Sequence, residues 1–322
     1  MKLVRTVSEL RAQLDAARRG GLTIGLVPTM GALHAGHLSL VARAREQCDA
    51  VVVTLFVNPS QFDERADLER YPRREGEDAE LAARAGADVL FAPSVAEVYP
   101  PGFATTVEVA GVTERLEGAA RGAEHFRGVA TVVTKLLCMA MPDVAYFGQK
   151  DAQQLVVIRR AAADLNLPVR IEALPTVREP DGLALSSRNA LLSADERAQA
   201  LALPAALRAA QALAGAGERS ARALLQAARE AMRPFAVEPE YVALVDPDTF
   251  EPVAELAREA LLALAARVGE VRLIDNATLS AAREPRTQGP REGAGAPAAA
   301  AAQARHDSTQ PLEGEAMAIC SA

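Results

Sequence analysis

The chain has 322 residues, about twice the usual length of one domain, so two domains are the starting expectation. Half of its residues are hydrophobic and 24% are charged, a balance that excludes a mainly disordered chain and is sufficient for a core. The formal net charge of −7 argues against nucleic acid or an anionic membrane as the main partner, because both require a basic surface.

The cysteine pattern and the hydrophobic runs indicate a cytoplasmic protein. Cys48, Cys138 and Cys320 are scattered and contain no CxxC pair, so neither a disulfide framework nor a structural zinc site is expected. The N-terminal segment is charged throughout and lacks the apolar stretch of a signal peptide. About 18 apolar residues without a charge would be needed to span a membrane, and no such run occurs.

From the N-terminus, an amphipathic helix is followed by five short apolar runs that alternate with helical segments. The runs are 22–29, 50–58, 88–93, 143–148 and 169–177, and the helical segments are 37–47, 75–85, 129–141 and 151–165. Strands that are apolar on both faces and alternate with helices indicate a parallel sheet covered on both sides. We therefore predict an α/β domain over residues 1–176, a Rossmann-like doubly wound parallel sheet with its site after the carboxyl ends of the strands.

Residues 177–282 are predicted to form a second, smaller α+β domain. Two helices rich in Ala, Leu and Arg, 194–214 and 219–232, precede strand signals at 241–245, 260–268 and 271–274. Segment 257–267 is ambiguous, because its Ala and Leu content favours a helix while its position between two strand signals favours a strand. The last region, 283–322, is rich in Ala, Gly and Pro and nearly lacks branched aliphatic residues, which predicts a disordered tail.

Two histidines follow the first predicted strand, where a helix begins. His34 and His37 are separated by two small residues, and such a junction can present imidazole N–H groups beside free backbone amides, which suits phosphate. Gly31 and Gly36 allow close approach of the backbone. The alternatives are two ordinary loop histidines, or a zinc site, although further ligands at suitable spacing are missing nearby.

Three other segments carry polar side chains after predicted strands. Asn58 and Gln61 can hold a small polar substrate, although a plain turn fits equally well. Lys150 is a compact cation suited to phosphate, and Asp151 can cap the next helix or orient the ammonium; a surface lysine before an N-cap is the alternative. Residues 186–189 supply two hydroxyls, a guanidinium and an amide. This segment is either an anion-binding loop or a simple turn between domains.

Common nucleotide and hydrolase fingerprints are missing from the sequence. No GxGxxG opens a helix after a strand, and neither GxxxxGK[ST] nor GxSxG occurs. Phosphate binding would therefore depend on the paired histidines, Lys150 and the loop around Arg188.

The motifs together resemble one family. The chain contains, in order, PTMGALHAGH, FVNPSQF, LEGAARGAEHFRGV, FGQKD and LALSSRN, and over residues 1 to about 280 it is similar to pantoate–β-alanine ligases (pantothenate synthetases), which are HxGH nucleotidyl transferases. The resemblance implies a cytoplasmic homodimer of the coenzyme A pathway. It would condense (R)-pantoate with β-alanine to pantothenate (vitamin B5), using ATP and Mg²⁺ and releasing AMP and pyrophosphate through a pantoyl adenylate. A second domain acting as a lid is also implied.

The resemblance also implies residue roles. His37, His34 and Lys150 would be catalytic, with His37 as proton donor, and Gln61, Gln154 and Asn58 would bind pantoate and β-alanine. No residue is assigned as a metal ligand. The ATP-binding residues would be Met30, Gly31, His34, Gly36, His37, Gly148, Gln149, Lys150, Asp151, Val177, Leu185, Ser186, Ser187 and Arg188.

The sequence departs from the family pattern at three places. Gln149 stands where FGEKD has Glu, Ser60 stands where NPMQF has Met, and the loop before His125 is one residue longer. A neutral Gln149 removes one possible acidic neighbour of Lys150, and Ser60 removes apolar packing beside pantoate. Two other functions stay open at this point: another nucleotidyl transferase of the same superfamily, and a non-catalytic nucleotide-binding module.

Overall fold

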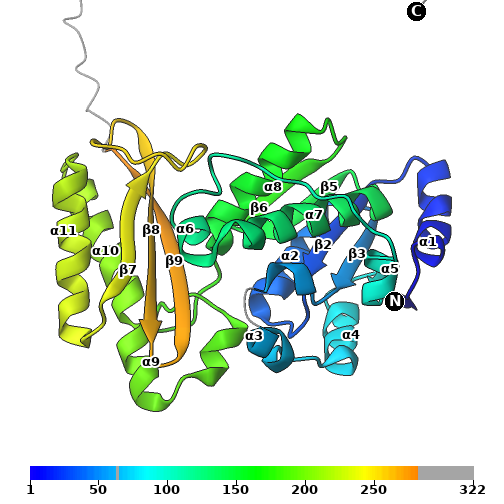
Figure 1. Cartoon of the computed structure of the whole chain (residues 1–322), viewed down its shortest axis with the longest axis horizontal. Coiled ribbons are helices and arrows are strands. Elements are labelled where there is room, and N and C mark those ends of the chain that lie inside the picture. The colour runs from blue at the N-terminus through cyan, green and yellow to red at the C-terminus, as the bar shows by residue number, and fades with distance from the viewer. Residues whose placement is uncertain (63–64, 282–322) are drawn as a thin grey trace, which may run out of the picture. The chain divides into compact units, whose positions relative to one another are not determined.

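A computed structural model describes residues 1–62 and 65–281, and a parallel six-stranded sheet forms the first part of the chain (Figure 1). The strand order is β1-β4-β3-β2-β5-β6, and every recorded pairing is parallel. The strands are β1 (Lys2–Val4), β2 (Ile24–Thr29), β3 (Ala50–Leu55), β4 (Val89–Phe91), β5 (Val144–Gly148) and β6 (Arg170–Leu174). The helices of this part are α1 (Val7–Arg19), α2 (Ala35–Gln47), α3 (Arg65–Arg70), α4 (Glu75–Arg84), α5 (Val95–Val98), α6 (Glu117–Arg121), α7 (Ala123–Ala140) and α8 (Ala152–Asp164).

Alternate residues of each central strand pack on opposite faces of this sheet. Leu26 and Val52 join a cluster with residues of α1, α7 and α8, whereas Val27 and Val53 join a cluster with residues of α2 and α4. Because side chains alternate along a strand, burial of both sets requires helices on both faces. The predicted doubly wound α/β fold is confirmed.

A smaller antiparallel sheet with the order β7-β8-β9 follows (Figure 1). Its strands are β7 (Pro239–Val245), β8 (Glu259–Val268) and β9 (Val271–Ser280), and its helices are α9 (Ala194–Ala200), α10 (Ala202–Gly215) and α11 (Ala221–Met232). Leu262 and Leu264 of β8 pack against α10 and α11, while Leu261 and Ala263 pack on residues of α7 and α8. The ambiguous segment 257–267 is therefore largely a strand, because burial on both faces outweighs the helix propensity of its residues.

Several element boundaries differ from the sequence predictions. The three-residue edge strand β1 was missed, since it is too short for a periodic signal. The predicted helix 194–214 divides at Leu201, and Pro204 lies near the start of α10, where it lacks the N–H that a continuous helix would need. The helix predicted at 129–141 begins earlier, at Ala123, and β9 continues to Ser280 instead of ending near Ile274.

The domain boundaries stay predictions. The chain leaves the first sheet after Leu174 and reaches α9 through a segment that contains the short 3₁₀ turn η3 (Ser187–Leu191). Residues Met1–Ala282 pack as one compact unit. The predicted disordered tail, 283–322, lies outside the described residues. No helix in the part that the structure describes has the length and apolar character needed to cross a membrane.

We predict that Gly128→Ala destabilises the fold. Gly128 lies in α7, and a Cβ atom there would stand 2.2 Å from the carbonyl oxygen of Ser60, in the 3₁₀ turn η1 (Pro59–Gln61). Overpacking of this kind costs about 1–3 kcal/mol, because the backbone must shift. The free energy of unfolding in urea measures this cost.

Gly215→Ala is the matched control. Gly215 is also helical, but a Cβ atom there would meet nothing within 4 Å, so this variant should be as stable as the parent or slightly more so. Equal stability of the two variants would contradict the tight contact between α7 and η1.

Candidate active site

One cavity of about 280 Å³ lies where β2 and β5 end, and the segment after β6 and the middle of β9 also line it. Gly31 and Gln149 do not line it; Gly31 lines a neighbouring hollow, and the Gln149 side chain is exposed. The other predicted site residues do line it: Met30, His34, Gly36, His37, Asn58, Gln61, Gly148, Lys150, Asp151, Gln154, Val177, Leu185, Ser186, Ser187 and Arg188.

The two histidines form a reciprocal cap at the N-terminus of α2. The Nδ1 atom of His34 accepts the N–H of Gly36 at 3.1 Å, and the Nδ1 atom of His37 accepts the N–H of His34 at 3.3 Å. Since Nδ1 accepts in both rings, each neutral imidazole carries its proton on Nε2. Gly36 is required here, because a Cβ atom would lie 2.9 Å from the His34 ring. Both rings therefore keep an Nε2–H group available as a donor.

Burial keeps both imidazoles neutral. It lowers the pKa of His37 to about 3, and the electrostatic influence of the neighbouring His34 and Lys150 acts in the same direction. Burial and the Lys150 ammonium also lower the pKa of His34 below its ordinary value. The charge of Lys150 is thus felt at both rings, and the histidines act as neutral donors beside a cation.

Lys150 and Asp151 lie in the 3₁₀ turn η2 (Gln149–Asp151), which connects β5 to α8. Asp151 occupies the N-cap position of α8 but makes no capping hydrogen bond with its side chain. The sequence left open whether Asp151 caps the helix or orients the Lys150 ammonium, and its carboxylate does not cap the helix. That carboxylate belongs to an exposed residue that lines the cavity.

The hydroxyl-rich loop reaches the same cavity. The Oγ atom of Ser186 accepts the N–H of Arg188 at 3.3 Å, which begins η3. Ser187 and Arg188 interact with Tyr71: burial raises the pKa of the Tyr71 phenol, and the Arg188 charge and a hydrogen bond from Ser187 oppose that rise. Tyr71 was not predicted, since a tyrosine in a charged helical region gives no recognisable signal.

The Asn58 side chain is held by contacts within the protein, and its contact with pantoate stays a prediction. It is 1% exposed, and its Nδ2 group donates to Gln61 Oε1 at 2.9 Å and to the carbonyl of Gly128 at 3.2 Å. Its Oδ1 atom accepts the hydroxyl of Tyr99 at 2.8 Å. The Nδ1 atom of His125 donates to the carbonyl of Gln61 at 2.8 Å. These contacts hold Gln61, whose own amide reaches the cavity.

Asp78 holds the turn between β2 and α2. It is 3% exposed, and its carboxylate accepts the N–H of Ala32 at 2.9 Å and that of Leu33 at 2.7 Å. Gly31, at φ +94°, is needed because a Cβ atom would stand 3.0 Å from this carboxylate. The sequence did not reveal this role, since Asp78 is one of several acidic residues in the first turn of α4, 46 residues from Ala32.

A buried ion pair joins the two sheets beside the cavity. Glu117, at the start of α6, is 8% exposed and accepts hydrogen bonds of 2.7 and 2.8 Å from Arg272 of β9 and one of 2.7 Å from the Tyr241 hydroxyl. Burial alone would raise the pKa of Glu117, but the hydrogen bonds and charge of Arg272 outweigh it and lower that pKa. Among residues 1–62 and 65–281, no group of three or more His, Cys, Asp or Glu side chains is arranged to hold a metal ion.

Comparison with known proteins decides the family. A family model described as pantoate-beta-alanine ligase matches residues 2–278. The chain belongs to this family. It is 52% identical to a pantothenate synthetase of Moorella thermoacetica over 280 residues, which are 87% of this chain and 99% of that protein. It is 54% identical to one of Heliobacterium modesticaldum over 278 residues, or 86% of this chain and 98% of that protein.

Solved structures of the family share the fold. The pantothenate synthetase of Thermus thermophilus is 48% identical with a TM-score of 0.82, covering 86% of this chain and 99% of that one. A pantoate-beta-alanine ligase from Francisella tularensis, complexed with beta-gamma ATP and beta-alanine, is 32% identical with a TM-score of 0.71, covering 86% and 97%. Family membership is thus established, and the role of each residue in this chain stays a prediction.

We predict that His37 makes stability depend on pH. Its pKa lies at about 3 in the folded state, against an ordinary value of 6.5, so the unfolded chain binds the proton first as pH falls. The resulting stabilisation is complete above about pH 6.5 and is lost progressively toward pH 3, by about 2 kcal/mol between pH 7 and pH 5. Urea unfolding at these two pH values should show a smaller loss for His37→Gln than for the parent. An identical loss in both proteins would contradict the buried neutral state.

Proposed function

We propose that this family member catalyses the ATP-dependent condensation of pantoate with β-alanine through a pantoyl adenylate. The observation that carries the proposal is the convergence on one cavity of two neutral imidazoles, the Lys150 ammonium, the Arg188 guanidinium and the amides of Gln61 and Gln154. Cationic and N–H donors suit the phosphates of ATP, and amides suit a hydroxylated acid. The Francisella tularensis relative, bound to beta-gamma ATP and beta-alanine, supports the same pair of substrates.

In the first step a carboxylate oxygen of pantoate attacks the α-phosphorus of ATP, and the bond to pyrophosphate breaks. Two anions must meet and negative charge builds on the departing group, so the barrier depends on preorganised positive groups. Lys150 and Arg188 supply that charge, and His34 and His37 donate their Nε2–H groups to phosphate oxygens. Because both imidazoles stay neutral, they hold the phosphates as hydrogen-bond donors while the lysine and the arginine supply the charge.

In the second step the amine of β-alanine attacks the acyl carbon of the adenylate, a C–N bond forms and AMP leaves with the electrons of the broken C–O bond. The attacking nitrogen releases one proton to water as the amide forms. Gln61 would orient pantoate and touch β-alanine, and Gln154 would hold a pantoate hydroxyl. A site built to hydrogen-bond hydroxyl groups rejects analogues without them, because its buried amides would lose their partners. The Gln61 amide is held for this task by Asn58.

The donor set of the cavity fits Mg²⁺ brought in with ATP. Mg²⁺ keeps several waters and takes one or two carboxylates together with substrate phosphates, and Asp151 offers an exposed carboxylate at the cavity wall. When bound, the ion would neutralise part of the charge on the pyrophosphate. We also propose a cytoplasmic homodimer in which residues 177–282 act as a lid. The scattered cysteines, which contain no CxxC pair, are consistent with a reducing cytoplasm.

The proposed reaction predicts exchange of labelled pyrophosphate into ATP that depends on pantoate and needs no β-alanine. This assay also separates the ligase from another nucleotidyl transferase and from a binding module, neither of which would show it. If exchange is absent while pantothenate still forms, the proposed adenylate intermediate is wrong. If neither is observed, the ligase function is wrong.

We predict that Lys150→Ala lowers the exchange rate by about 10²–10³-fold and leaves the melting temperature nearly unchanged. The ammonium lies on a partly exposed turn, so its loss removes charge stabilisation at the phosphates without opening the core. Lys2→Ala, the same substitution at an exposed position of β1, is the control and should exchange normally. Near-normal exchange by Lys150→Ala would contradict the role of Lys150 at the phosphates.

A further inference from the structure

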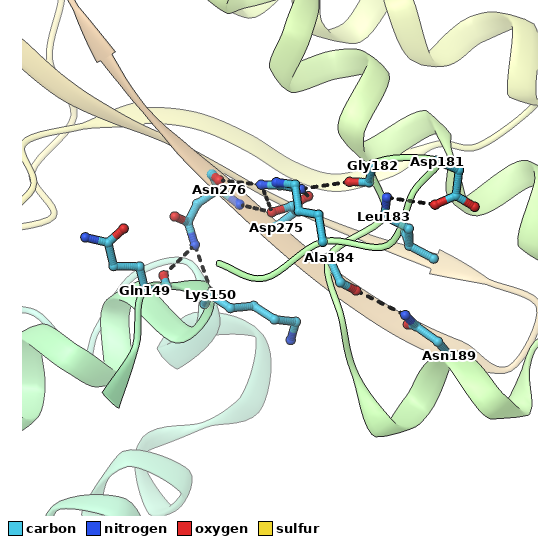
Figure 2. Close-up of polar contacts among 10 residues, drawn as sticks. Gln149, Lys150, Asp181, Gly182, Leu183, Ala184, Asn189, Asp275 and Asn276 are labelled. Carbon is cyan, nitrogen blue, oxygen red and sulfur yellow. Dashed lines mark hydrogen bonds and ion pairs between the residues drawn. The ribbon is translucent and has the colours of Figure 1, made fainter. Parts of the chain in front are cut away.

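The turn that carries Lys150 is held by a side chain from the second sheet. Asn276 of β9 donates both hydrogens of its Nδ2 group to consecutive carbonyls, that of Gln149 at 3.0 Å and that of Lys150 at 2.8 Å (Figure 2). Asn276 is 9% exposed, so these bonds are shielded from water. Two bonds from one planar group restrain two successive peptide planes, and these planes set the direction in which the Lys150 side chain leaves the turn.

The same contact keeps unwanted negative charge away from the substrate. In Figure 2 the carbonyl oxygens of Gln149 and Lys150 point to Asn276, and the ammonium lies at the far end of the Lys150 side chain. Carbonyl oxygens carry a partial negative charge, so a peptide plane turned toward the cavity would repel phosphate. Anchoring both carbonyls on Asn276 leaves the Lys150 ammonium and the Asp151 carboxylate as the groups of this turn that line the cavity.

Asn276 is itself fixed by a buried ion pair. The neighbouring carboxylate of Asp275, 1% exposed, accepts two bonds from Arg178, at 2.6 and 2.9 Å, and a third from the N–H of Asn276 at 2.8 Å. Arg178 also donates to the carbonyl of Asn276 at 3.3 Å and to that of Gly182 at 3.0 Å. A buried pair with every strong acceptor engaged is rigid, and removal of one partner leaves a costly unpaired charge.

Arg178 belongs to the segment that leads to the hydroxyl-rich loop. It follows Val177 directly, forms a β-bridge with Ala184, and the N–H of Leu185 donates to the carbonyl of Val177 at 2.9 Å. Two neighbouring residues of β9 therefore hold both segments that reach toward the phosphates: Asn276 holds the Lys150 turn, and Asp275 holds the segment before Ser186.

We propose that Asn276 is a positioning residue for adenylation, which acts through the Lys150 turn and is held in place by the Arg178–Asp275 ion pair. This inference rests on the proposed function, because it assumes that Lys150 stabilises the transferring phosphate. Asn276 lines the cavity, but both hydrogens of its amide group are bound to backbone carbonyls, and the part that the proposal gives it is to place another side chain. Its effect must then disappear when the lysine side chain is absent.

A double-mutant cycle tests this dependence. Asn276→Ala, Lys150→Ala and the double variant are compared with the parent in pantoate-dependent pyrophosphate exchange, measured as kcat/KM for ATP. A misplacement of about 1 Å costs about 10²-fold in rate, so Asn276→Ala alone should lose about 10- to 100-fold. In the Lys150→Ala background the same change should cost less than about threefold. Exchange by the parent confirms the function separately, so failure of the cycle would concern Asn276 alone.

Thr131→Val is the control for a general loss of packing. Thr131 is 5% exposed, accepts the N–H of Val107 at 2.9 Å through its hydroxyl and does not line the cavity. This variant and Asn276→Ala should both lower the melting temperature, by about 2–4 °C for each kcal/mol lost from the free energy of unfolding. Only Asn276→Ala should change the exchange rate. Equal costs of Asn276→Ala with and without Lys150, or near-normal exchange by Asn276→Ala, would overturn the proposal.

Discussion

Burial of both faces of the parallel sheet is the constraint on which the site depends. Helices cover both faces of the sheet, so the loops that connect strands and helices lie at the ends of the strands. There their polar backbone groups are exposed to water. The order β3-β2-β5-β6 brings the segments after four strands to the same edge. At β2 the strand order reverses, with β3, β4 and β1 on one side and β5 and β6 on the other, and ligands of doubly wound folds bind at such a reversal.

The charge pattern of the cavity follows from this burial. The imidazoles of His34 and His37 lie close together, with ring centroids 4.1 Å apart, and they stay neutral because burial and a nearby ammonium both disfavour a further positive charge. Positive charge at the cavity then comes from Lys150, Arg188 and Arg121, which belong to different segments of the chain. The lining also includes three acidic residues, Glu117, Asp151 and Asp275, so the cations lie among carboxylates.

The second sheet contributes to the site mainly through backbone and ionic contacts. Arg272 pairs with Glu117 of α6, and the Asp275 carboxylate pairs with Arg178. Both ion pairs are largely shielded from water, and the cost of desolvation offsets most of the attraction between their charges. They therefore contribute more to the orientation of the segments that they join than to the free energy of unfolding. β9 thus contacts three parts of the site: α6 through Arg272, the segment after β6 through Asp275, and the turn after β5 through Asn276.

The sequence by itself determined the architecture and most of the residues that meet at the cavity. The alternation of apolar runs with helical segments indicated the parallel sheet. The HxGH, QKD and SSR motifs each follow a strand, so the topology predicted that they line one cavity. Periodicity could not decide segment 257–267, because β8 is buried on both faces and therefore has no alternation to detect. Only the tertiary structure assigned Asp78, Tyr71, Asp275 and Asn276 to the site, since each acts across a long stretch of chain on a backbone group or a loop, and such contacts leave no local pattern.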